Sequence, residues 1–130
     1  MAEDERRQKI LRYRILEQQM TQLQQQLELL EQNLAEVGNT LSAIDDLKLS
    51  KPGSSMLAPL SSGIFVQAKL QDNDTFIVNV GSNVTVQKKS DEVKKILDSQ
   101  SKEIIEMRDE MVKGMEQLAS QMNSLETELG

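Results

Sequence analysis

The chain has 130 residues and a formal net charge of −6, and only 2% of its residues are aromatic. So few rings exclude an ordinary globular interior, and the abundance of Leu, Met, Gln, Glu and Lys at a low mean hydropathy of −0.47 favours long helices. The chain contains neither Cys nor His, which excludes disulfides, thiol catalysis, the usual zinc sites and the commonest general base. An acidic chain is also a poor match for nucleic acid, because phosphate binding requires a basic face.

Residues 1–48 are predicted to form a long coiled-coil helix. When Tyr13 is taken as position a of a heptad, every a and d position as far as Ile44 is apolar. Five unbroken heptads predict a coiled coil, because this spacing keeps one apolar stripe facing a partner helix. Pro52 and Gly53 cannot continue the helix. The predicted seam residues are Tyr13, Leu16, Met20, Leu23, Leu27, Leu30, Leu34, Val37, Leu41 and Ile44.

Residues 49–89 are predicted to form a β insert of four strands in two hairpins. Apolar and polar residues alternate in residues 64–70 and 75–80, which flank the turn Asp72-Asn73-Asp74. A further strand at residues 84–86 follows the turn Gly81-Ser82-Asn83. Residues 56–60 give a weaker first strand, which Pro59 restricts to a sheet edge.

Residues 90–130 are predicted to form a second coiled-coil helix, with Ser90 as its N-cap. Its apolar stripe steps by four and three residues, except for two consecutive steps of four at Met107, Met111 and Met115. Such a stutter should unwind the supercoil beside Gly114. The predicted stripe is Val93, Leu97, Gln100, Ile104, Met107, Met111, Met115, Leu118, Met122, Leu125 and Leu129.

The short insert implies that the two helices return side by side as an antiparallel hairpin. Their inner ends lie near residues 48 and 88, so the numbers of opposed residues should sum to about 136. This register places Tyr13 near Met122 and the basic residues from Arg6 to Arg14 near Glu126. The isolated strands would expose an apolar face and open edges, so we expect them to pair with the inserts of other subunits.

The order of these elements, with the junction residues, resembles the alpha class of the prefoldin family of hexameric co-chaperones. The resemblance rests on Pro59-Leu60-Ser61-Ser62-Gly63 and on Val78-Asn79-Val80-Gly81 leading to Val84-Thr85-Val86. The beta class has a single hairpin in this place. The resemblance implies α+β subunits, two alpha and four beta, whose inserts form a β-barrel platform from which the coiled coils hang. It also implies an ATP-independent holdase, not an enzyme, whose coiled-coil tips bind non-native proteins and pass them to a group II chaperonin. The chain has no Walker-type loop, in keeping with that role.

Candidate client-binding residues lie off the seam near the free end of the first helix. An exposed apolar cluster suits a holdase, because a non-native client has no fixed shape and is held by non-directional burial. The alternative is that these side chains pack against a local neighbour or against the frayed C-terminus. The cluster is Ile10, Leu11 and Ile15, and fraying would add the seam residues Met122, Leu125 and Leu129. Residues expected to be buried in the platform are Ile64, Phe65, Val66, Phe76, Ile77, Val78, Val80, Val84 and Val86.

Other functions are less consistent with the sequence. Paired acids such as Asp109-Glu110 point about 100° apart on a helix and cannot converge on one ion, so we expect no metal or other cofactor. The first residues are charged and no apolar run approaches the roughly 18 residues of a membrane span, so we expect a cytoplasmic protein. A coiled-coil spacer that tethers one folded partner is the main alternative function. A tRNA-binding coiled-coil arm is a third, which the acidic helices disfavour.

Overall fold

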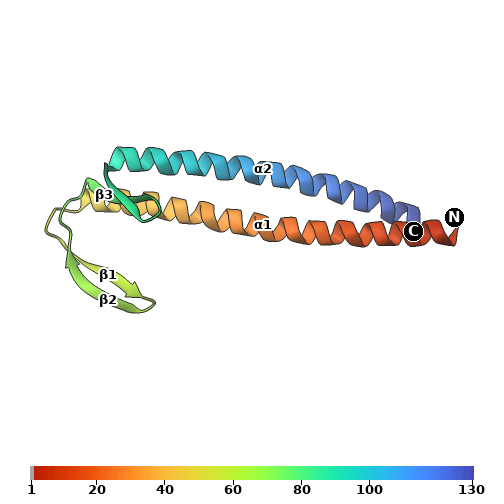
Figure 1. Cartoon of the computed structure of the whole chain (residues 1–130), viewed down its shortest axis with the longest axis horizontal. Helices are drawn as coiled ribbons and strands as arrows, with labels where there is room; N and C mark the ends of the chain where they lie inside the picture. Colours follow the sequence, from red (N-terminus) through yellow and green to blue (C-terminus); the bar gives the residue numbers. More distant parts are fainter. Residues whose placement is uncertain (1) are drawn as a thin grey trace. The chain divides into compact units, whose positions relative to one another are not determined.

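The computed structural model describes residues 2–130, and its elements follow the predicted order (Figure 1). Helix α1 (Glu3–Leu49) and helix α2 (Ser90–Leu129) enclose the four strands β1 (Ser55–Ser61), β2 (Ile64–Lys69), β3 (Thr75–Gly81) and β4 (Val84–Lys89). The predicted fold class, two long helices with a four-stranded insert, is therefore confirmed. Among the described residues no helix is both long enough and apolar enough to cross a membrane.

The described residues form two compact units, which do not coincide with the three predicted segments. The coil unit contains the helical residues up to Ala35 and from Ser101, and the insert unit contains residues 36–100. Each long helix therefore contributes to both units. The division into functional segments at residues 48 and 89 stays a prediction.

The two helices pair antiparallel in the predicted register. In the coil unit, Lys9 Nζ lies 3.0 Å from Glu128 Oε2, and the Arg6 guanidinium donates to the carbonyl of Leu129 at 3.4 Å. In the insert unit, the ammonium group of Lys94 pairs with the carboxylate of Asp45. The numbers of these opposed residues all sum to within a few units of 136, as predicted.

The predicted seam of α1 is confirmed by the burial of its side chains. Between Leu11 and Asp46, the side chains that are not exposed are the ten predicted a and d residues. Leu16, Leu30 and Ile44 are the most buried of them. A 3.5-residue apolar repeat was therefore sufficient to identify this stripe.

The predicted seam of α2 is wrong at two positions. Gln100 and Met107 are exposed, and Ser101 and Arg108 are half-buried in their place. The alternation of three and four residues is then unbroken from Ser101 to Leu129, so the consecutive steps of four fall at residues 93–101 and not beside Gly114. An arginine can occupy a seam position because its aliphatic stem packs against apolar neighbours while its guanidinium reaches water. Apolarity alone therefore selected Met107 wrongly.

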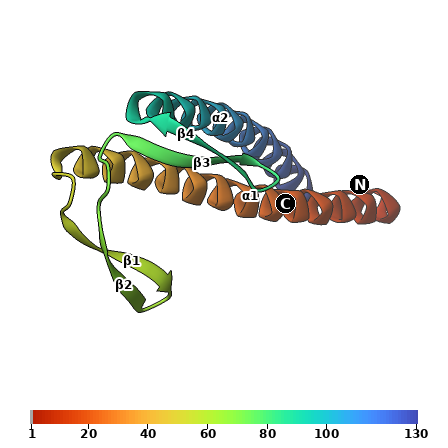
Figure 2. The same cartoon turned by 60° about the vertical axis from the view of Figure 1, so that its left-hand side comes forward.

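The insert consists of two separate antiparallel hairpins, each a two-stranded sheet (Figure 2). In the first, Ala58 lies opposite Val66, and in the second, Val78 lies opposite Val86. Strand β1 pairs with β2 along its length, with a register irregularity between Pro59 and Ser61, and it is longer than predicted. The β3–β4 loop consists of Ser82 (φ 49°) and Asn83 (φ 63°), the two left-handed residues of a type I′ turn.

Candidate functional site

The exposed apolar surface near the free end of α1 consists of Leu11 and Ile15. Their exposed fractions are 58% and 54%, and their spacing of four residues makes them neighbours on one helical face. Ile10 is half-buried, so the predicted three-residue cluster is reduced to two exposed members. The heptad explains the difference, because Ile10 occupies an e position at the flank of the seam, whereas Leu11 and Ile15 point further outward.

Three polar contacts hold the end of α2 against α1 in this region. The Tyr13 hydroxyl donates to Glu126 Oε1 at 2.5 Å, beside the contacts of Lys9 with Glu128 and of Arg6 with Leu129. The hydrogen bond to Glu126 and partial desolvation raise the pKa of Tyr13, because both oppose a negative phenolate. These contacts fix the helix end that carries the last seam residues.

The three seam residues that were proposed to bind clients are covered in the folded protein. Leu125 is 8% exposed, and Met122 and Leu129 are half-buried. They could contact a client only if the end of α2 separated from α1, so their role in binding stays a prediction.

A groove of about 540 Å³ lies between the helices beside the free end. Charged side chains of both signs line it, including Lys9, Arg12 and Glu128, and Leu125 contributes apolar surface. The sequence did not reveal this groove, because it depends on how the two helices lie side by side.

Each hairpin of the insert has one largely apolar face. Alternation and the observed strand pairing place Met56, Ala58, Ile64, Val66 and Ala68 on one face of β1–β2, and Phe76, Val78, Val84 and Val86 on one face of β3–β4. Phe65 and Ile77 point to the opposite faces, although both were predicted to share in assembly. Val80 lies at the register irregularity of β3 and is exposed. All of these side chains are half-buried or exposed, so the hairpins offer apolar surface for association.

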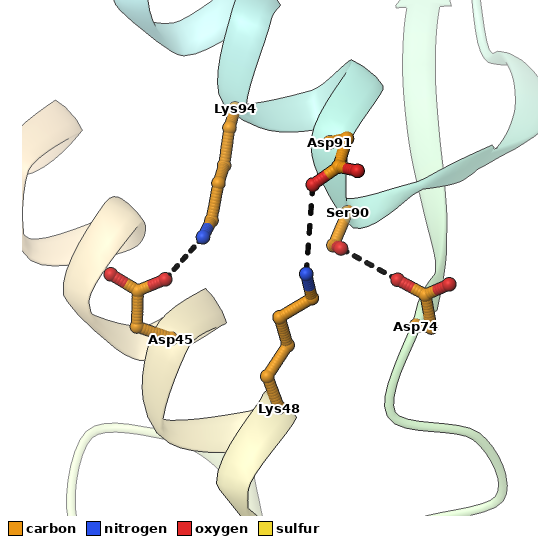
Figure 3. Close-up of polar contacts among 6 residues, drawn as sticks. All are labelled: Asp45, Lys48, Asp74, Ser90, Asp91 and Lys94. Atoms are coloured by element: carbon orange, nitrogen blue, oxygen red, sulfur yellow. Dashed lines mark hydrogen bonds and ion pairs between the residues drawn. The ribbon is translucent and has the colours of Figure 1, made fainter.

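A polar junction ties the start of α2 to the segment between the hairpins (Figure 3). Ser90 is buried, and its hydroxyl donates to Asp74 Oδ1 at 2.6 Å while its amide donates to the carbonyl of Asp74 at 3.0 Å. Ser90, the predicted N-cap, is the first residue of α2, and its hydroxyl is the donor in this bond. The bond from Ser90 lowers the pKa of Asp74, because it favours the charged carboxylate.

The same junction joins the two helix ends. Lys48 Nζ lies 3.6 Å from Asp91 Oδ1, and the hydrogen bond between Lys94 and Asp45 raises the pKa of Lys94 by favouring its charged form (Figure 3). The side-chain amide of Asn73 donates to the carbonyls of Lys48 and Ser50 at 3.2 and 3.0 Å, which caps the end of α1. The predicted turn at residues 72–74 therefore links the end of α1 to the start of α2. Its Asn and Asp residues, types that commonly bond to backbone groups, were the signal available in the sequence.

The part of the chain that the structure describes contains no assembled metal site. Among residues 2–130, no three His, Cys, Asp or Glu side chains gather where they could hold an ion.

Comparison with known proteins identifies the family. The family model described as "Prefoldin subunit" matches residues 16–130. The prefoldin subunit alpha of Thermofilum pendens is 25% identical over 90% of this chain and 91% of its own length. The prefoldin subunit alpha of Methanobrevibacter smithii is 31% identical over 85% of this chain and 75% of its own length. A chain from the cryo-EM structure of filamentous PFD from Methanocaldococcus jannaschii has the same fold, with a TM-score of 0.79 and 22% identity over 89% of this chain and 96% of that one.

The chain belongs to the prefoldin family. Its curated relatives and its two hairpins place it among the alpha-class subunits. The family consists of non-enzymatic co-chaperones whose subunits assemble with other prefoldin subunits, and this membership supports a co-chaperone role for the chain.

Proposed function

We propose that this chain is a subunit of an ATP-independent holdase in the cytoplasm, which binds non-native proteins at the distal tips of its coiled coils. The observation that supports this proposal is the exposed pair Leu11 and Ile15 near the free end of α1. Delivery of the bound protein to a group II chaperonin is the expectation that family membership adds.

The size of the exposed pair argues for several tips acting together. Full burial of an aliphatic side chain contributes about 1.5–3 kcal/mol, so two side chains that are roughly half exposed contribute about 2–3 kcal/mol. A millimolar dissociation constant corresponds to a binding free energy of about 4 kcal/mol. One tip alone would therefore bind a client more weakly than that. A client bound by one tip would therefore leave quickly, whereas several linked tips raise one another's effective concentration.

The apolar faces of the hairpins supply the surface for that linkage. We propose that they associate with the inserts of beta-class subunits in a β-barrel platform of two alpha and four beta chains. Burial of Ile64, Val66 and Val84, which are exposed in the isolated subunit, favours such association.

The experiment replaces Leu11 and Ile15 together by Ser in the assembled complex. The double variant should keep its mass and helix content but suppress the aggregation of an unfolded test protein less well. Val112→Ser is the matched control, because Val112 is an exposed apolar residue on the other helix. The wild-type activity should change little with salt, since apolar burial is not screened. Full activity of the double variant, or wild-type activity that disappears at high salt, would contradict the proposal.

A second candidate function is tethering of one folded partner. The fixed pattern of charges around the tip groove, with Lys9, Arg12 and Glu128, favours it. A panel of unrelated non-native proteins separates the two functions, because a holdase binds many of them and a tether binds none.

A further inference from the structure

A second groove in the coil unit lies away from the tip and has a different chemical character. Its volume is about 360 Å³, and its floor includes the seam residues Leu23 and Leu118. Its rim consists of amide side chains from both helices, namely Gln19, Gln22, Gln26 and Gln117. None of the described residues that line this groove is ionisable, whereas charges of both signs line the groove at the tip.

Gly114 lines this groove without contributing a side chain. It lies in the interior of α2 and lines the groove, and a Cβ built there would lie 3.8 Å from Leu23 Cδ1, which is an ordinary van der Waals contact. Alanine would therefore fit, and it would favour the helix more than glycine does. Neither helix stability nor steric space requires a glycine here, and the missing side chain leaves room on this part of the groove lining.

The lining indicates what could occupy the groove. A glutamine side chain carries one amide acceptor and two amide donors, which match the C=O and N–H groups of a peptide backbone. An uncharged lining also suits an uncharged main chain and gives no attraction to nucleic acid. The volume is near the lower end of the roughly 300–1,000 Å³ of ligand sites, so it suits a short segment and not a folded domain.

The groove continues the exposed surface of the tip along one helical stripe. Ile15, Gln19, Gln22, Gln26 and Leu29 follow at alternating steps of four and three, so they share one side of α1. Ile15 and Leu29 mark the two ends of this stripe and are 54% and 60% exposed. Their separation of fourteen residues corresponds to about 21 Å. An extended chain spans that distance with about six or seven residues.

We propose that this glutamine-lined groove binds the backbone of an extended segment of a non-native polypeptide, with apolar side chains of that segment on Ile15 and Leu29. The inference rests on the proposed function, because it assigns a second contact to the same client. Such a groove gives the holdase a preference for certain client segments, which an apolar tip alone lacks. The favoured segment has apolar residues about six positions apart and small or polar residues between them.

The test measures peptide binding to the assembled complex by fluorescence anisotropy. The probe is a peptide of about nine residues with Leu at positions six apart and Ser or Gly between them. The reference peptide has the same composition with its Leu residues adjacent. The wild-type complex should bind the spaced peptide at least threefold more tightly than the adjacent one, and equal affinities would contradict the proposed spacing.

Gly114→Ala adds a methyl group to the groove lining and should weaken binding of the spaced peptide three- to tenfold, while the midpoint of thermal unfolding stays the same or rises. Gly38→Ala is the matched control, because Gly38 also lies inside a helix and the described atoms leave more than 4 Å of open space around its added Cβ. It should stabilise the helix without changing affinity. A second pair is Gln22→Glu, which places a charge on the rim, and Gln25→Glu, which places it on the outer face of the same helix. Of these two, Gln22→Glu alone should weaken binding.

The outcomes separate this inference from the proposed function. If Gly114→Ala binds the spaced peptide as tightly as the wild type, or if Gly38→Ala weakens binding equally, the groove is not the binding site. If the Leu11 and Ile15 double variant nevertheless loses holdase activity, the tip function stands without the groove. If neither variant affects clients, both proposals fail.

Discussion

A single charge on the apolar face of the first hairpin should block assembly while leaving the subunit folded. Val66 lies opposite Ala58 on that face and is 46% exposed, so Val66→Asp disturbs little within the isolated chain. In the assembly the carboxylate would be buried without a partner, which costs about 3–5 kcal/mol. Loss of the remaining valine burial adds about 1 kcal/mol. A total of about 4–6 kcal/mol weakens association roughly 10³- to 10⁴-fold.

The assay is the mass of the complex after co-expression with a beta-class partner, measured by native mass spectrometry. Gln67→Asp is the matched control, because Gln67 is the next residue of β2, is exposed, and points to the opposite face. The Gln67 variant should assemble and the Val66 variant should not, with equal helix content by circular dichroism. An intact complex from the Val66 variant, or equal loss in both, would show that this face is not buried on assembly.

Three further predictions concern the subunit itself. The pKa of Asp74 is lowered by the Ser90 hydroxyl, so the stabilisation from this contact is complete above the ordinary carboxyl pKa of about 3.9 and is lost as the pH falls through the lower folded value. Acid titration followed by circular dichroism should show this component in the wild type and not in Asp74→Asn. Ser82→Gly should stabilise the β3–β4 turn by up to about 1 kcal/mol, because φ is +49° at this position, and an unchanged or lower melting temperature would contradict this. Leu125→Ala should cost about 2–4 kcal/mol in denaturant unfolding because Leu125 is buried, whereas the exposed Leu11→Ala should stay within about 0.5 kcal/mol.

The sequence predicted those parts of the fold that depend on local periodicity. The heptad of α1 repeats an apolar residue without exception, and burial follows it from Tyr13 to Ile44. In α2 the choice between Met107 and Arg108 could not be made from apolarity, because a long charged side chain can bury its stem in a seam. Met107 and Arg108 are distinguished only by their spacing. Steps of three and four residues alternate without a break from Ser101 only if Arg108 is the seam residue.

The candidate sites were less predictable, because they depend on which residues become neighbours. Leu11 and Ile15 could be placed off the seam from the heptad alone, but the half-burial of Ile10 depends on the facing helix. Strand alternation also predicts that Ile77 and Val78 point to opposite faces, although both were assigned to one buried platform. The hydrogen bond from Ser90 to Asp74 joins residues on either side of a hairpin, so no local sequence pattern reveals it.

The two exposed apolar surfaces differ in size, and this difference suits their proposed functions. Two half-exposed side chains at the tip contribute about 2–3 kcal/mol, whereas the four exposed side chains Met56, Ile64, Val66 and Val84 on the hairpin faces contribute about 3–6 kcal/mol for each subunit. The platform contribution overlaps only the lower end of the entropic cost of an association step, which is estimated at 4–15 kcal/mol or more. The tip contribution cannot offset a comparable cost for a single contact. If the tips bind clients as proposed, a client would stay bound only while several tips engage it, and it would leave when another protein displaces them one at a time. On that proposal, weak reversible capture at the tips and tighter assembly of the hairpins would both follow from apolar burial over unequal areas.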